Sequence, residues 1–158
     1  MVYDEIPHDP YLIGQIGEAI AQRRLHLRRL HVVSLKECNR LVKEKKMCAE
    51  IPLLLSKYDH VVDLFTIVEQ DDISTIELYE VKTRFHYLPT PTSWRIPKIG
   101  WKTVEMAKEA ELLSIKFYIA LITIYPSWKY HIEVRPYNVN DFVVDKPRIR
   151  SKNGASPP

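Results

Sequence analysis

The chain has 158 residues, of which 46% are hydrophobic and 27% are charged, and these values exclude a wholly disordered chain. The 23 Lys and Arg side chains outnumber the 20 Asp and Glu side chains, and the resulting net charge of +3 permits a nucleic-acid partner without requiring one. No apolar run approaches the roughly 20 residues of a transmembrane helix. The N-terminus is acidic and lacks an apolar signal core. We therefore expect a cytoplasmic protein that does not span a membrane.

The length predicts one domain, which we expect to occupy residues 1–145. Within it, the charged and helix-prone segment 36–52 is interpreted as an inserted helix that ends at Pro52. Residues 146–158 are basic at first and then small, polar and rich in proline, which predicts a disordered tail.

The first predicted element is a helix that begins after Asp9 and ends near Leu30. Asp9 can cap the first free backbone N–H groups, and Pro10 suits the first helical position. Apolar residues then recur at helical spacing. Gly14 and Gly17 weaken this helix, which indicates that another part of the chain approaches it closely.

The later elements are predicted mainly from β-branched and aromatic runs separated by polar turns. Strands are expected over 31–35, 60–69, 75–85, 116–125 and 129–137, and a further helix over 102–113. Residues 116–125 are nearly all apolar, which is typical of a strand buried on both faces. The order of elements predicts an α/β fold with a mixed central sheet and helices on both faces.

The second and third strands are predicted to form a hairpin with its turn at 71–72. This register places Phe65 opposite Leu78 and, farther from the turn, Asp63 opposite Glu80. The apolar pairs support the register, because a slip of one residue would move every side chain to the other face. Two carboxylates are therefore expected to lie side by side.

Lys82 follows Glu80 by two residues and shares its face. Adjacent carboxylates repel, and either an ammonium or a hard divalent cation with oxygen ligands relieves the repulsion. A metal-bound water beside a lysine is suited to attack on a phosphodiester. The alternative is an ordinary ion pair at the sheet edge between Lys82 and Glu80 or Asp63.

Asp63, followed 17 residues later by Glu80-Val81-Lys82, resembles the D…(D/E)-x-K signature of the PD-(D/E)XK, or restriction-endonuclease-like, nuclease superfamily. The segment 14–21, followed by a basic stretch and a strand, and the run 80–84 are similar to archaeal Holliday-junction resolvases. The resemblance covers most of the chain and implies an αβββαβ core.

The resemblance also implies a role for each residue of the motif. Asp63 and Glu80 would bind Mg²⁺ or Mn²⁺, together with the backbone carbonyl of Val81. Lys82 would activate the attacking water, and Glu18 of the first helix would assist. For Glu18, an exposed position on the helix is the alternative.

These roles imply a metal-dependent DNA endonuclease, selective for four-way or branched DNA, that acts in DNA recombination or repair. A homodimer is expected because two strands are most simply cut by two sites related by a two-fold axis. Its interface is expected among exposed apolar residues near the end of the chain. The expected dimer residues are Trp128, Tyr130, Ile132 and Val134, and the expected nucleic-acid contacts are Arg84, Tyr87, Arg95, Lys98 and Lys102.

Two other functions fit the same residues. One is a catalytically silent nucleic-acid-binding module with this fold. The other is a nuclease directed at RNA or at single strands, in defence or in viral replication. Asp59 is either an accessory metal ligand or a turn residue, and we favour the turn.

Overall fold

The computed structural model describes residues 9–29, 40, 43–44, 47–58, 61–62, 64–70, 73–86 and 98–145. Several predictions fall outside these residues. They are the strand at 31–35, part of the segment 36–52, the tail at 146–158, and the residues Asp59, Asp63, Tyr87 and Arg95.

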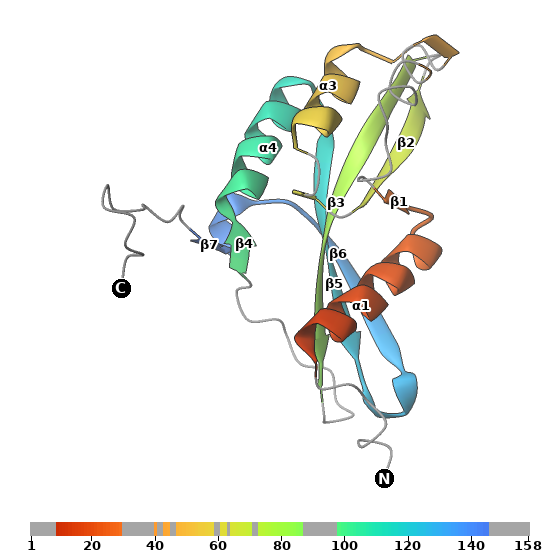
Figure 1. The fold of residues 1–158 in the computed structure, drawn as a ribbon, viewed down its shortest axis with the longest axis vertical. Helices are drawn as coiled ribbons and strands as arrows, with labels where there is room; N and C mark the ends of the chain where they lie inside the picture. The colour runs from red at the N-terminus through yellow and green to blue at the C-terminus, as the bar shows by residue number, and fades with distance from the viewer. Residues whose placement is uncertain are drawn as a thin grey trace, which may run out of the picture.

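A five-stranded sheet, in the order β1-β2-β3-β5-β6, forms the centre of the molecule (Figure 1). The strands are β1 (Arg28–Arg29), β2 (Leu64–Gln70), β3 (Ile73–Phe85), β5 (Lys116–Ile124) and β6 (Tyr130–Pro136). β3 and β5 run parallel, and the other neighbours run antiparallel. The predicted α/β fold with a mixed sheet is confirmed.

Helix α1 (Pro10–Arg24) begins where the sequence predicts. The side chain of Asp9 accepts a hydrogen bond of 2.9 Å from the backbone N–H of Tyr11. The prediction that this helix continues to about Leu30 is wrong. The chain leaves the helix after Arg24, and His26 has a φ of 53°, a left-handed conformation that a helix cannot contain. Arg28 and Arg29, which were predicted to lie in the helix, form the strand β1 instead.

Helix α3 (Glu50–Lys57) overlaps only the end of the predicted insert helix. The prediction that Pro52 ends a helix is wrong, because Pro52 lies in the first turn of α3. Backbone N–H groups in the first turn have no partner within the helix, so a proline there loses no hydrogen bond.

Helix α4 (Trp101–Leu112) agrees with its prediction and connects β3 to the parallel strand β5. Two further strands were not predicted, β4 (Lys98–Gly100) and β7 (Val143–Asp145), which pair in parallel beside α4. Short 3-10 helices, η3 (Pro126–Trp128) and η4 (Val139–Asp141), precede β6 and β7. Within the described residues, none of the helices has the length and apolar character needed to cross a bilayer.

The register of the central hairpin is as predicted. Phe65 lies opposite Leu78, and Ile67 lies opposite Ile76. The last described pair of this ladder joins Leu64 to Tyr79. The expected burial of β5 is also confirmed, because its residues from Ile119 to Ile124 are all buried.

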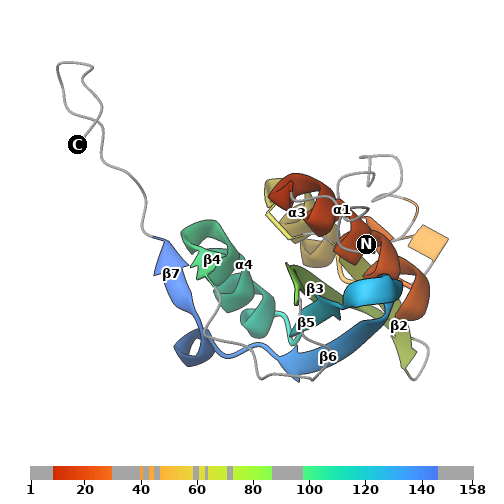
Figure 2. The same ribbon diagram turned by 90° about the horizontal axis from the view of Figure 1, so that it is seen from below.

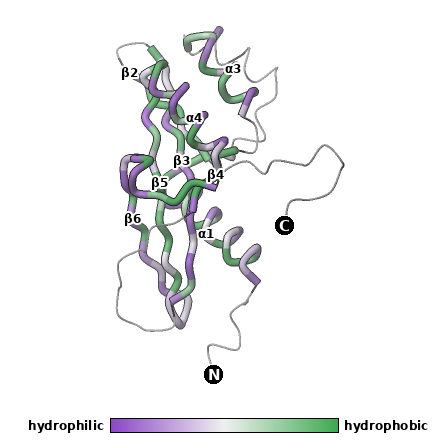
Figure 3. Tube along the Cα trace, turned by 90° about the vertical axis from the view of Figure 1, so that its left-hand side faces the viewer, coloured by the Kyte–Doolittle hydropathy of each residue, from purple (hydrophilic) through white to green (hydrophobic). Residues whose placement is uncertain are grey.

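Two hydrophobic clusters cover the opposite faces of the sheet, one under α1 and the other under α3 and α4. In Figure 2, α4 and α1 are seen to the left and to the right of β3. The first contains Ala21, Leu64, Val81 and Ile122, and the second contains Leu54, Leu78, Met106 and Ile119. Hydrophobic and hydrophilic residues both occur along α1 and α3, as expected for helices with one face on a sheet (Figure 3). Because side chains alternate along β3, Glu80 and Lys82 lie on the α3 and α4 side, and Val81 and Thr83 lie on the α1 side.

Candidate functional site

Glu80 and Lys82 form an ion pair on the face of β3 opposite α1. Glu80 Oε1 lies 3.2 Å from Lys82 Nζ. Glu80 is only 7% exposed, and its neighbours in the sheet include Ile119 of β5. A carboxylate buried beside apolar side chains is costly unless a positive charge and hydrogen bonds compensate it. Glu80 and Lys82, two of the predicted site residues on β3, therefore lie together, with Glu80 buried and Lys82 partly accessible.

β2 begins one residue after Asp63, and its first pair joins Leu64 to Tyr79, the residue before Glu80. Asp63 itself lies outside the described residues. Its expected convergence with Glu80 stays a prediction. Among the residues that the structure describes, no three His, Cys, Asp or Glu side chains form a group that could hold a metal ion.

Glu18 lies on α1 and is partly buried. The neighbouring Gly17 packs against Thr83, and α1 covers the face of the sheet that carries Val81. Glu80 and Lys82 point to the other face. The structure does not bring Glu18 together with them in any described contact, and an assisting role for Glu18 stays a prediction.

Arg84 extends the row of charged side chains from Glu80 and Lys82 along β3. Its Nε donates a hydrogen bond of 3.1 Å to Thr123 Oγ1, on the neighbouring strand β5. Thr123 is 1% exposed. A buried hydroxyl therefore fixes this guanidinium two residues from Lys82. Thr123 was not predicted as a site residue, although a hydroxyl in an almost wholly apolar strand was a usable signal.

Two further predicted nucleic-acid contacts that the structure describes, Lys98 and Lys102, lie around the N-terminus of α4. Lys98 of β4 forms an exposed ion pair of 3.4 Å with Asp145 of β7. Lys102 Nζ lies 5.6 Å from the centre of the Trp101 ring. The Thr103 hydroxyl lies 3.5 Å from the backbone oxygen of Val61. This contact joins the start of α4 to the turn that leads into β2, so α4 begins near the predicted site.

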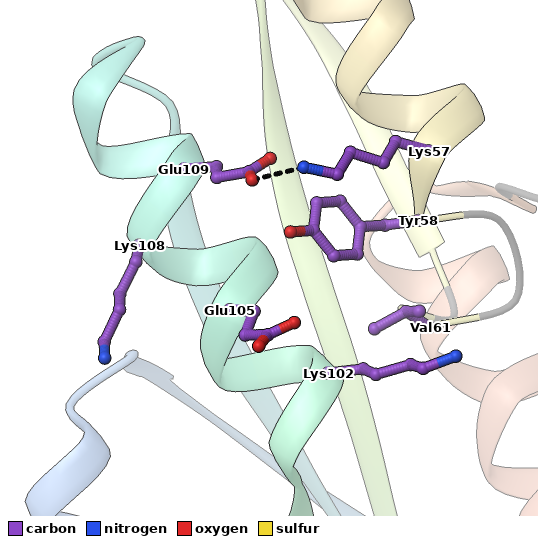
Figure 4. A pocket seen from close by; sticks show the side chains of 7 residues that line it. All are labelled: Lys57, Tyr58, Val61, Lys102, Glu105, Lys108 and Glu109. Carbon is purple, nitrogen blue, oxygen red and sulfur yellow. Dashed lines mark hydrogen bonds and ion pairs between the residues drawn. The ribbon is translucent and has the colours of Figure 1, made fainter.

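A cavity of about 580 Å³ lies between α3 and α4 (Figure 4). Lys57 Nζ and Glu109 Oε1 close one end with an ion pair of 2.6 Å. This hydrogen bond raises the pKa of Lys57 and lowers the pKa of Glu109. Burial raises the pKa of Tyr58, whose hydroxyl points toward α4. At the other end, Lys102 extends toward Val61. The cavity therefore extends from the ion pair of Lys57 and Glu109 toward the turn before β2.

Comparison of the chain with protein-family models, with curated proteins and with solved structures finds no significant match.

Proposed function

We propose that this protein is a metal-dependent DNA endonuclease with a restriction-endonuclease-like core, which hydrolyses phosphodiester bonds by means of Asp63, Glu80 and Lys82. The observation that carries the proposal is the ion pair of 3.2 Å between the buried Glu80 and Lys82. These are the two ends of the Glu-x-Lys motif, and they lie on the strand next to the one that Asp63 precedes.

The order of elements supports the proposed core. α1, β1, β2, β3, α4 and β5 follow one another as helix, three strands, helix and strand, apart from the short α3 and β4. β2 is antiparallel to β3, whereas β5 returns parallel to β3. This is the αβββαβ order that the sequence resemblance implies.

The donor set fits a hard divalent cation such as Mg²⁺ or Mn²⁺. Carboxylate and carbonyl oxygens are the ligands that these ions prefer, and one or two carboxylates suffice when waters complete the shell. Glu80 and Asp63 would supply the carboxylates, and the backbone of Val81 would supply a carbonyl. When bound, the cation supplies Lewis-acid polarisation of the phosphate and lowers the pKa of a coordinated water.

Other side chains of the site would act on the attacking water and on the phosphates of the substrate. The Lys82 ammonium donates hydrogen bonds, so it orients the attacking water or stabilises the negative charge that develops on the phosphate. Glu80 holds the ammonium in place through their ion pair. Arg84, on the same face and fixed by Thr123, would bind a neighbouring phosphate of the same strand.

The proposed substrate is branched DNA, such as a four-way junction, and the proposed assembly is a homodimer. The substrate follows from the resemblance to junction resolvases, and the homodimer follows because two strands are most simply cut by two sites related by a two-fold axis. Lys102 adds a positive charge at the start of α4, where the cavity between α3 and α4 approaches the turn before β2. A backbone phosphate would be attracted to that end of the cavity.

A cleavage assay tests the proposal directly. The protein is incubated with Mg²⁺ or Mn²⁺ and labelled four-way junction, duplex, single-stranded DNA or RNA. We expect cleavage of branched DNA, and Lys82→Ala should slow it about 100-fold or more while the substrate still binds. Lys116→Ala, an exposed change at the start of β5, is the matched control and should leave the rate unchanged.

Three other results would each contradict a part of the proposal. Binding without cleavage by the parent protein would contradict the enzyme and support a silent module. Cleavage of RNA or single strands alone would contradict the proposed substrate. Equal cleavage by Lys82→Ala would contradict the site.

A further inference from the structure

β6 is the outermost strand of the sheet on one side. Among the described residues it pairs only with β5, through the seven residues from Tyr130 to Pro136. An edge strand of this length presents a row of backbone N–H and C=O groups on which another strand can pair.

The backbone pattern tells which residues face the open edge. Tyr125 N–H donates to Lys129 O at 2.7 Å, and Tyr137 N–H donates to Phe117 O at 2.8 Å. In an antiparallel ladder, alternate residues direct both backbone groups toward the same neighbour. The odd-numbered residues of β6 therefore bond to β5, and the even-numbered residues direct their N–H and C=O groups outward.

The two faces of β6 carry side chains of different character. Tyr130 and Val134, which lie on the α1 side, are 37% and 40% exposed, and Ile132 between them is partly buried against the α1 cluster. On the other side, His131 is exposed and Glu133 is partly exposed. The exposed apolar side chains alternate with polar ones along a strand whose outward backbone groups are available for pairing.

We propose that a second copy of this chain pairs antiparallel along β6, with the two-fold axis at Ile132. Tyr130 would then lie opposite the partner's Val134, and His131 would lie opposite the partner's Glu133. The outward backbone groups of Tyr130, Ile132 and Val134 would all be bonded, and the two sheets would become one continuous sheet.

Charge and backbone chemistry each disfavour one alternative register. An axis at Glu133 would place two carboxylates directly opposite each other, which is destabilising. An axis at Val134 would place Pro136 within the ladder, where it has no N–H to donate. With the axis at Ile132, Pro136 lies just beyond the paired residues and ends the ladder.

The purpose of this dimer rests on the proposed function, since two sites related by a two-fold axis suit the cutting of two strands. The association itself is measured without metal or nucleic acid. A failure of the dimer is therefore distinguishable from a failure of the nuclease.

Sedimentation equilibrium of the full chain over a range of concentrations gives the first test. We expect the parent protein to form a dimer. Val134→Lys should weaken the dimer about tenfold or more, because it removes two cross-strand apolar pairs. Val143→Lys, in β7 and 49% exposed, is the matched control and should leave the association unchanged. Circular dichroism shows whether each variant is folded. A monomeric parent, or a dimer that Val134→Lys does not weaken, would overturn the proposal.

Cysteine variants test the register. Residues on the axis of such a ladder have Cα atoms about 5.5 Å apart, within reach of a disulfide. Ile132→Cys should therefore form a covalent dimer on oxidation, beyond any formed by the parent. Val134→Cys should not, because the two copies of residue 134 would be about 14 Å apart. Equal cross-linking by both variants, or none by Ile132→Cys in a dimeric protein, would rule out the axis at Ile132.

Discussion

Gly17 of α1 lies directly against Thr83 of β3. A Cβ atom at position 17 would lie 1.7 Å from Thr83 Oγ1 and 2.7 Å from Thr83 Cβ. The helix can lie this close to the sheet only because position 17 has no side chain. The close approach predicted from the glycines in the sequence is therefore real, and at this position it is an approach to the strand that carries Glu80 and Lys82.

We predict that Gly17→Ala destabilises the protein. The methyl group overlaps the body of a β-branched side chain, so α1 must shift away from β3, and the expected loss is about 1–3 kcal/mol in the free energy of unfolding. Urea denaturation followed by circular dichroism measures it.

Gly14→Ala is the matched control, in the same helix three residues earlier. Nothing lies within 4 Å of the position of its Cβ. An alanine there should stabilise the protein by about 0.5–1 kcal/mol, the usual gain from replacing a helical glycine. In the Gly17→Ala background, Thr83→Gly should recover part of the loss. If the two alanine variants were equally stable, the packing of Gly17 on Thr83 would be refuted.

The ion pair between Lys57 and Glu109 predicts a dependence of stability on pH. The hydrogen bond from Lys57 lowers the pKa of Glu109 in the folded state, so this contribution is present above about pH 4.3 and is lost as the pH falls through the lowered value. The pKa of Lys57 is raised, so its contribution is present below about pH 10.4 and is lost as the pH rises through the raised value.

Thermal unfolding at a series of pH values checks this dependence. Glu109→Gln should reduce the loss of stability on acidification relative to the parent, and the difference should shrink in high salt, because both groups are exposed. Glu111→Gln, on the same helix, is the control. Identical pH profiles for the parent and Glu109→Gln would contradict the contribution of this pair.

Arg84 should contribute to nucleic-acid binding more than to the chemical step. Its guanidinium lies on the face of Glu80 and Lys82 and is positioned by Thr123. Arg84→Ala should raise KM and reduce the salt dependence of binding by about one ionic contact. Fluorescence anisotropy over a salt series gives the slope. Thr123→Val should reproduce part of the rise in KM without changing the slope. An unchanged slope in Arg84→Ala would show that Arg84 binds no phosphate.

The sequence was most informative where two independent patterns agreed. In the central hairpin, alternation along each strand and the matching apolar pairs allow one register only, and Phe65 does lie opposite Leu78. Asp9 and Pro10 similarly mark the start of α1, because a capping side chain and a proline both favour a helix N-terminus.

The sequence was least informative where contacts between distant parts of the chain determine the local structure. α1 was expected to continue to Leu30 because its apolar spacing continues, but the chain turns at His26 to pair β1 with β2. β4 and β7 are three residues each, and their paired residues, such as Lys98 and Val143, are far apart in the chain, so neither strand has a local signature. The hydrogen bond between Arg84 and Thr123 depends on the parallel register of β3 and β5, which no local pattern specifies.

The most direct test of the central claim is the binding of Mn²⁺ to the free protein, measured by electron paramagnetic resonance. If Asp63 and Glu80 share one cation, Asp63→Asn and Glu80→Gln should each weaken Mn²⁺ binding by about tenfold or more. Asp141→Asn, in the 3-10 helix before β7, should leave it unchanged. Parent-like affinity in both Asp63→Asn and Glu80→Gln would contradict a shared metal site and, with it, the proposed nuclease.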